Sequence, residues 1–169
     1  FIGVINLMFG QNNPNVLIKN NVFKVSYNET LEQPNWVEYS VRKITKIADR
    51  KGMDFHTVKG VYTSNSADYK NNVWDKGHLA PAATFSDSRE NLKQTFSYLN
   101  CALQNQYLNR GAWRILEEQE RKWDDQEELR VTIKIEFSDS ILPTGATIPS
   151  RFIKCIEFTK SNVHRCFSF

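Results

Sequence analysis

Three runs of alternating apolar and polar residues constrain the fold most, because a period of two places every second side chain on one face of a strand. These runs predict β-strands at 22–27, 36–41 and 129–137, and residues 152–158 predict another strand. The longest helical pattern covers 108–127, where apolar residues recur every three or four positions. This mixture predicts an α+β fold with a sheet sandwiched or flanked by helices.

Local signals set the boundaries between these elements. Residues 33–35 (Gln-Pro-Asn) predict a break ahead of the second strand, and the apolar run 96–99 predicts a further short strand. Ser88 predicts the N-cap of a short helix that begins near Arg89. Residues 44–69 show no clean period, and a loop of this length in a compact domain is usually functional.

The length of 169 residues suits one domain over 1–169, and the net charge of +3 is mild. Residues 117–128 hold seven acidic residues against two basic ones, a local net charge of −5 that leaves +8 for the remainder. A basic working surface opposite an acidic helix end suits a polyanionic substrate. A solvated, salt-bridged helix surface is the simpler explanation of the acidic run, and charge alone favours it.

The three cysteines are Cys101, Cys155 and Cys166, and none are close enough in sequence for a zinc pattern. Cys155 and Cys166 can face each other across a hairpin as one disulfide, which leaves Cys101 as a buried thiol. Because the count is odd, the cysteines leave the redox compartment open.

The first nine residues, FIGVINLMF, are apolar and do not begin with Met. Residues 1–13 therefore have two interpretations. They are either the remnant of a signal peptide or an extra strand followed by a turn at 10–14. No apolar run in the chain reaches membrane-spanning length, so no membrane partner is expected.

The clearest chemical signal is the motif Asp75-Lys76-Gly77-His78, which precedes Leu79-Ala80-Pro81. An imidazole that titrates near neutrality suits a general base for phosphodiester hydrolysis. Lys76 offers a cation for phosphate, Asp75 can hold the strand end through hydrogen bonds, and Gly77 allows a sharp turn. A lone histidine is more often structural, so the motif alone is a modest hint.

A second block strengthens this signal. Residues 99–118, LNCALQNQYLNRGAWRILEE, place the amides of Asn100, Gln104 and Asn109 ahead of a Gly-x-Trp-x-x-Leu-Glu pattern. The two blocks together resemble the signature of the DNA/RNA non-specific endonucleases, the Serratia-type and endonuclease G-type branch of the His-Me finger nucleases. The resemblance covers roughly residues 22–158. The matching positions of the second block are Asn100, Gln104, Asn109, Trp113, Leu116 and Glu117.

The resemblance implies a ββα-metal fold with a central, mainly antiparallel sheet flanked by helices. It implies that His78 is the general base and that Asn109 is the main protein ligand of one Mg²⁺, for which Mn²⁺ or another divalent cation can substitute. Glu117 is then expected to orient water on the metal, and Asn100 to support the histidine or the metal-site loop. A helix cap is the simpler use of Asn109, and both roles are compatible.

The resemblance also implies substrate contacts. Arg50 lies in the region where the family places a phosphate-clamping arginine, a loose match that a solvated loop arginine explains almost as well. Lys76 and Asp75 complete the expected substrate-binding set. Lys76 stands where the family has arginine and loses the planar fork, so its phosphate contact is expected to differ. Leu99 and Leu103 replace a serine and a proline of the usual pattern.

The expected partners are DNA and RNA, bound through the phosphate backbone, and a homodimer is left open. Secretion or periplasmic export is expected, because a non-specific nuclease endangers its own cytoplasm. Two alternatives share the same residues: a nucleic-acid-binding module that has lost catalysis, and an antibacterial toxin nuclease. The sequence does not decide between DNA and RNA.

Overall fold

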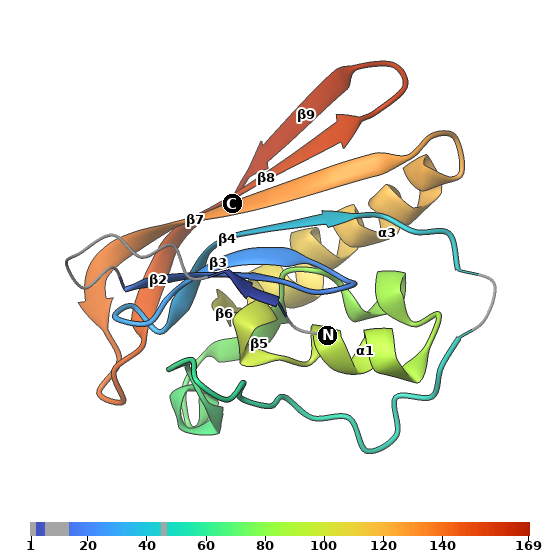
Figure 1. Cartoon of the computed structure of the whole chain (residues 1–169). Coiled ribbons are helices and arrows are strands. Elements are labelled where there is room, and N and C mark those ends of the chain that lie inside the picture. Colours follow the sequence, from blue (N-terminus) through green and yellow to red (C-terminus); the bar gives the residue numbers. More distant parts are fainter. Residues whose placement is uncertain (1–2, 6–13, 45–46) are drawn as a thin grey trace.

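The computed structural model describes residues 3–5, 14–44 and 47–169. Its main element is a seven-stranded antiparallel sheet in the order β1-β2-β3-β4-β7-β8-β9 (Figure 1). A separate antiparallel ribbon pairs β5 with β6. The strands are β1 (Gly3–Ile5), β2 (Asn15–Lys19), β3 (Lys24–Asn28), β4 (Gln33–Ser40), β5 (Trp74–His78), β6 (Cys101–Asn105), β7 (Leu129–Ile141), β8 (Thr147–Phe158) and β9 (Val163–Ser168).

The helices are short, apart from α3 (Arg114–Asp124), which lies behind the sheet in Figure 1. A wide helical turn, which we call the π turn, joins α3 to a single α-helical turn that directly follows β6, and its backbone is kinked and non-helical at Gly111 (φ −104°, ψ −111°). No helix among the described residues is long and apolar enough to cross a bilayer. The remaining helical segments are α1 (Arg89–Thr95), α2 (Gln106–Leu108), the π turn (Asn109–Trp113) and the 3₁₀ turns Ser66–Tyr69, Ala82–Phe85 and Tyr98–Asn100.

The core lies on one face of the main sheet, which we call the inner face. Alternate residues of β3, β4, β7 and β8 point into this core, as a period of two requires. The π turn and α3 close it with Trp113 and Leu116, and the segments around β5 and β6 contribute Leu79 and Ala102. The main inward-facing residues of the sheet are Val25, Tyr27, Val37, Tyr39, Val131, Ile133, Phe152 and Ile156.

Several sequence predictions are confirmed. The structure has the predicted strands as β3, β4, β7 and β8, and the predicted helix 108–127 as α2, the π turn and α3. Ser88 caps α1, because its Oγ accepts the backbone N–H of Asn91 at 3.1 Å. The α+β class with a mainly antiparallel sheet is therefore correct.

The predicted break at 33–35 is wrong, because β4 begins at Gln33 and continues through Pro34. The register of β3 against β4 shifts between Ser26 and Tyr27, beside Pro34. Such an irregularity accommodates a residue that cannot donate a ladder hydrogen bond. Gln33 also explains the continuity, since its Oε1 accepts the N–H of Leu103 at 3.1 Å.

The predicted strand at 96–99 is also wrong. Phe96 ends α1, and the Oγ of Ser97 accepts the N–H of Leu99 at 3.2 Å, which favours the 3₁₀ turn seen at Tyr98–Asn100. The strand of this region, β6, begins only at Cys101. The hydrogen bond to Ser97 thus favours a turn where the apolar residues alone would favour a strand.

The two ends of the chain complete the sheet. Gly3–Ile5 pairs with β2 as β1, whereas residues 1–2 and 6–13, with most of the predicted turn at 10–14, lie outside the described residues. At the other end, a disulfide joins Cys155 and Cys166, which are directly opposite in β8 and β9. Cys101 is a buried free thiol.

Candidate active site

The β5–β6 ribbon carries the histidine motif, with His78 as the last residue of β5, opposite Cys101. Gly77 is buried one position earlier, and the side chain of Gln104 lies directly over it. A Cβ atom at Gly77 would lie 2.5 Å from Oε1 and 2.6 Å from Cβ of Gln104. The glycine is therefore required by a close approach across the ribbon.

His78 lies between two aromatic rings. Its ring centroid is 4.7 Å from that of Phe55 and 4.8 Å from that of Phe96. Its Nε2 is buried and has no hydrogen-bond partner among the described residues. Burial, and secondarily the charge of Arg50, lowers the pKa of His78 to about 3. The imidazole is therefore neutral at neutral pH, which is the form that accepts a proton.

Two predicted phosphate-binding cations lie beside His78. The guanidinium of Arg50 is 5.3 Å from the ring centroid of Phe96. The Nζ of Lys76 is 5.5 Å from the ring centroid of Phe55, and it is 3.2 Å from Oδ1 of Asp54. The structure thus brings Arg50, Lys76 and His78 together around shared aromatic rings.

Sequence reasoning missed these aromatic residues. Phe55 reaches His78 because His56 forms an isolated parallel bridge with Ser97. The N–H of His56 donates to the carbonyl of Phe96 at 2.9 Å, and its carbonyl accepts the N–H of Tyr98 at 3.0 Å. This pairing holds the part of the irregular loop 44–69 around His56 against the end of β5. No local sequence pattern predicts the pairing.

Asn109 begins the helical segment Asn109–Trp113, which is kinked at Gly111. Its Nδ2 donates to Oδ2 of Asp75 at 2.9 Å. Arg110 holds the same carboxylate in a two-pronged contact, with Nε 2.8 Å from Oδ2 and an Nη 2.7 Å from Oδ1. An ionised carboxylate only accepts hydrogen bonds, so the amide nitrogen must face Asp75 and Oδ1 of Asn109 is left for another partner.

The hydrogen bonds from Arg110, assisted by Asn109, lower the pKa of Asp75 and keep it ionised. Both oxygens of Asp75 are occupied by these donors, which suits a residue that positions Asn109 better than one that binds an anionic phosphate. Sequence reasoning also missed Arg110, although its place beside Asn109 was a usable signal.

Asn100 is fully buried and acts through the backbone. Its Oδ1 accepts the N–H of Ala80 at 2.8 Å, and its Nδ2 donates to the carbonyls of Ala80 and Thr95 at 2.9 and 3.0 Å. These bonds fix the chain two residues after His78. The expected supporting role is therefore directed at the loop that follows the histidine.

Glu117 lies on α3 beside a buried charge network. Burial raises its pKa to about 7, against the lowering effect of Lys154 and with a further raising effect from Glu120. Lys154 and Glu120 form an ion pair of 2.6 Å in which both side chains are 0% exposed. The hydroxyl of Tyr39 donates to the second oxygen of Glu120 at 2.8 Å.

The predicted residues form two groups at the two ends of β5. His78, Arg50 and Lys76 gather at one end, and Asn109 is held by Asp75 at the other. Among the residues that the structure describes, no hydrogen bond or ion pair joins Asn109 or Glu117 to the histidine group. The backbone of β5 is the connection, because Asp75 and His78 are three residues apart in one strand.

The donor set fits a hard divalent cation held by few protein ligands. No group of three or more His, Cys, Asp or Glu residues that could hold a metal is present in the described parts of the chain. The free Oδ1 of Asn109 is a hard neutral oxygen, and Mg²⁺ commonly keeps several waters and takes other ligands from substrate phosphates. A closed structural zinc site is inconsistent with this donor set.

The sequence of the chain is similar to a known family and to several characterised nucleases. The family model of the DNA/RNA non-specific endonucleases matches residues 3–165. A nuclease of Serratia marcescens is 32% identical over 166 residues, which cover 87% of this chain and 60% of that protein. The mitochondrial nuclease EXOG of Danio rerio is 33% identical over 98 residues, which cover 55% of this chain and 29% of that protein. The chain thus spans less than two thirds of these relatives.

A solved structure agrees in fold. The chain matches the EndoG structure from a complex of EndoG with EndoGI with a TM-score of 0.75 and 22% identity, over 90% of this chain and 72% of that one. The arrangement of β5, β6 and the helix after them accordingly has the ββα-metal nuclease fold. By its sequence match over nearly the whole chain, this protein belongs to the DNA/RNA non-specific endonuclease family.

Proposed function

We propose that the chain is a metal-dependent, sugar-non-specific endonuclease that hydrolyses phosphodiester bonds of DNA and RNA and leaves 5′ phosphates. One observation carries the proposal: β5 holds a neutral buried imidazole at one end and, through Asp75, an oriented carboxamide at the other. Family membership supports the substrate class. We take residues 1–169 to be one nuclease domain.

His78 is the proposed general base. Its unpartnered Nε2 takes a proton from the attacking water, and the oxygen attacks phosphorus in line with the departing 3′ oxygen. The imidazolium that forms in this buried site is stabilised by the negative charge of the phosphate. Arg50 and Lys76 stabilise the additional negative charge of the transition state, although Lys76 must first give up part of its contact with Asp54.

Asn109 is the proposed metal ligand through Oδ1, and Mg²⁺ is the expected ion, with Mn²⁺ or another divalent cation as a substitute. When bound, the ion supplies positive charge to the scissile phosphate and the leaving oxygen. Glu117 orients water near the ion. With a pKa of about 7 in the protein alone, its carboxyl is half ionised at neutrality.

Substrate recognition is proposed to use phosphate and sugar contacts, so sequence preference is slight and binding weakens with salt. The disulfide between Cys155 and Cys166 supports a secreted or periplasmic location, because such bonds persist in oxidising compartments.

Cleavage of plasmid DNA and of RNA in Mg²⁺ tests the proposal, with His78→Ala and Asn109→Ala as the informative variants. His78→Ala should lower the rate by about 10²–10⁴, and Asn109→Ala should shift activity to much higher Mg²⁺. His164→Ala, which removes an exposed histidine of β9, is the matched control. Wild-type protein that fails to nick across several divalent metals would leave the non-catalytic binding module as the better account.

A further inference from the structure

The second face of the main sheet is not covered by any helix of the described chain, and we call it the outer face. The strand registers place its side chains in cross-strand rows, because directly opposite residues of antiparallel strands share a face. One row runs Ser26, Trp36, Lys134 across β3, β4 and β7. The neighbouring row runs Lys19, Lys24, Glu38, Thr132 across β2, β3, β4 and β7.

Trp36 lies at the centre of this face, half-buried between two lysines. The Nζ of Lys24 is 5.4 Å from its ring centroid, and Lys134 is its direct cross-strand neighbour on β7. A hollow of about 380 Å³ opens here, lined by Lys24, Trp36, Glu38, Thr132 and Lys134. An aromatic ring with a cation on either side therefore forms the floor of an open depression.

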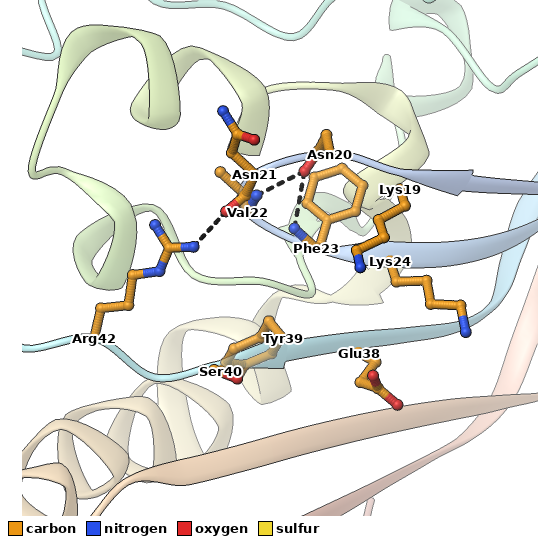
Figure 2. A pocket seen from close by; sticks show the side chains of 10 residues that line it. All are labelled: Lys19, Asn20, Asn21, Val22, Phe23, Lys24, Glu38, Tyr39, Ser40 and Arg42. Atoms are coloured by element: carbon orange, nitrogen blue, oxygen red, sulfur yellow. Dashed lines mark hydrogen bonds between the residues drawn. The ribbon is translucent and has the colours of Figure 1, made fainter. Parts of the chain in front are cut away.

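A second hollow, of about 310 Å³, continues this depression toward the β2–β3 turn. The two hollows share Lys24 and Glu38. Figure 2 shows the side chains of Lys19 and Lys24 above Glu38, with Arg42 at the far end of the hollow. The guanidinium of Arg42 donates to the carbonyl of Asn21 and so borders the hollow.

The charges of the two hollows are not balanced. Lys19, Lys24 and Lys134 form no ion pair within 4 Å among the described residues, whereas Arg130 and Arg151 elsewhere on this face pair with Glu157 and Glu136. Within the described ranges, Glu38 is the one carboxylate that lines either hollow. Three unneutralised ammonium groups around one acid, with a neighbouring guanidinium, are complementary to a polyanion.

We propose that the outer face is a second nucleic-acid-binding site, which holds a single-stranded segment with a base on Trp36 and phosphates on Lys19, Lys24 and Lys134. A single strand is favoured because an aromatic ring on an open sheet stacks only on an unpaired base. The inference rests on the proposed nuclease function for its ligand class.

The proposed site on the outer face is separate from the proposed site of cleavage at His78. The β5–β6 ribbon and α3 pack on the inner face, so nucleotides on Trp36 are not those that reach His78. The outer face therefore retains a distal part of a long substrate while another part is cleaved. It is expected to lower KM for long single strands and to leave cleavage of a dinucleotide unchanged.

Binding of fluorescent oligo(dT) with a chelator present, which prevents cleavage, tests the site directly. The triple variant Lys19→Gln/Lys24→Gln/Lys134→Gln should lower the slope of log K against log salt by about 2, or about 0.7 for each lost phosphate contact. Trp36→Ala should weaken binding about tenfold. Glu38→Gln should tighten binding, a gain that a folding defect does not produce.

The triple variant Lys70→Gln/Lys122→Gln/Lys160→Gln is the matched control, because it removes the same charge from exposed positions outside both hollows. Equal salt slopes in the two triple variants, or a neutral effect of Glu38→Gln, would overturn the proposal. A concentration-dependent dimer in sedimentation experiments that Trp36→Ala dissociates would also overturn the proposal. A second copy of the chain would then occupy the outer face. Dinucleotide cleavage in Mg²⁺ separately reports whether the nuclease function itself fails.

Discussion

The Nδ2 of Asn109 lies 2.9 Å from Oδ2 of Asp75, and this contact fixes which end of the carboxamide is presented to a ligand. Asp75 belongs to the histidine motif and Asn109 to the helix after β6, 34 residues later. One strand therefore carries the proposed base and, through a carboxylate, sets the direction of the proposed metal ligand.

Asp75→Asn should raise the Mg²⁺ concentration for half-maximal activity by about 10- to 100-fold, the usual effect of losing a group that orients a metal ligand. An asparagine has one acceptor oxygen, whereas Asn109 and Arg110 together use both oxygens of Asp75. Metal titration of nicking measures this change. Asp87→Asn is the control, because Asp87 accepts from the amide of Asn91 on α1. An unchanged Mg²⁺ requirement in Asp75→Asn would mean that another contact orients Asn109.

Acid should weaken the fold partly through His78. Its pKa is about 3 in the folded protein and about 6.5 when unfolded, so protons bind the unfolded chain first. The contribution of His78 to the free energy of unfolding is fully present above about pH 6.5 and falls steadily toward about pH 3. His78→Phe keeps a ring but cannot titrate, so urea unfolding at several pH values should give a flatter curve. His164→Ala should follow the wild-type curve, and a His78→Phe curve as steep as wild type would contradict the buried neutral imidazole.

Removing one partner of the buried ion pair between Lys154 and Glu120 should strongly lower the stability of the fold. Lys154→Met leaves the Glu120 carboxylate buried without its cation, and this should lower the free energy of unfolding by about 3–5 kcal/mol. Chemical denaturation measures the loss, and adding Glu120→Gln should recover part of it. Lys43→Met breaks an exposed pair with Asp125 and should have little effect. Equal effects of the two lysine variants would argue against the buried network.

Most strands of the main sheet could be predicted from the sequence, because a strand with one buried face has a buried side chain at every second position. The strands β7 and β8 show this alternating burial. The failures occurred where tertiary or local polar contacts override the pattern. Pro34 lies inside β4 because the register shifts beside it, and 96–99 turns because Ser97 bonds to the backbone of Leu99. The strand β2, Asn15–Lys19, was missed because Val16, Leu17 and Ile18 are consecutive apolar residues that show no alternation.

Gly77→Ala should destabilise the β5–β6 ribbon by about 1–3 kcal/mol or more, because its Cβ would overlap the side chain of Gln104. Thermal or urea unfolding measures the cost. Combining it with Gln104→Gly removes the overlapping Cβ and should restore part of the stability. If Gly77→Ala had the same free energy of unfolding as wild type, β5 and β6 would have to move apart without loss of stability.

Reduction of the disulfide should cost about 3 kcal/mol, since Cys155 and Cys166 close a loop with a sequence separation of 11. Wild-type protein in dithiothreitol and Cys155→Ser/Cys166→Ser without it should unfold at the same urea concentration. The double variant is its own control, because reductant should leave it unchanged. A further loss in the double variant on reduction would point to a different role for Cys101.

The candidate site was foreseeable where two sequence blocks matched a family at fixed spacing, which located His78, Asn109 and Glu117. The aromatic surroundings of His78 were not foreseeable, because Phe55 arrives through a bridge between residues 56 and 97 that has no local signal. The roles of His78, Asn109 and Asp75 are predictions that their variants test.

The kink inside Asn109–Trp113 has a consequence for the two halves of this helical stretch. The backbone leaves helical geometry at Gly111 (φ −104°, ψ −111°), so the residues before the kink are not in phase with those after it. Asn109 faces Asp75, while Trp113, Leu116 and Glu120 keep to the core. A substitution that straightened this stretch would turn Asn109 away from Asp75, with every proposed site residue still encoded.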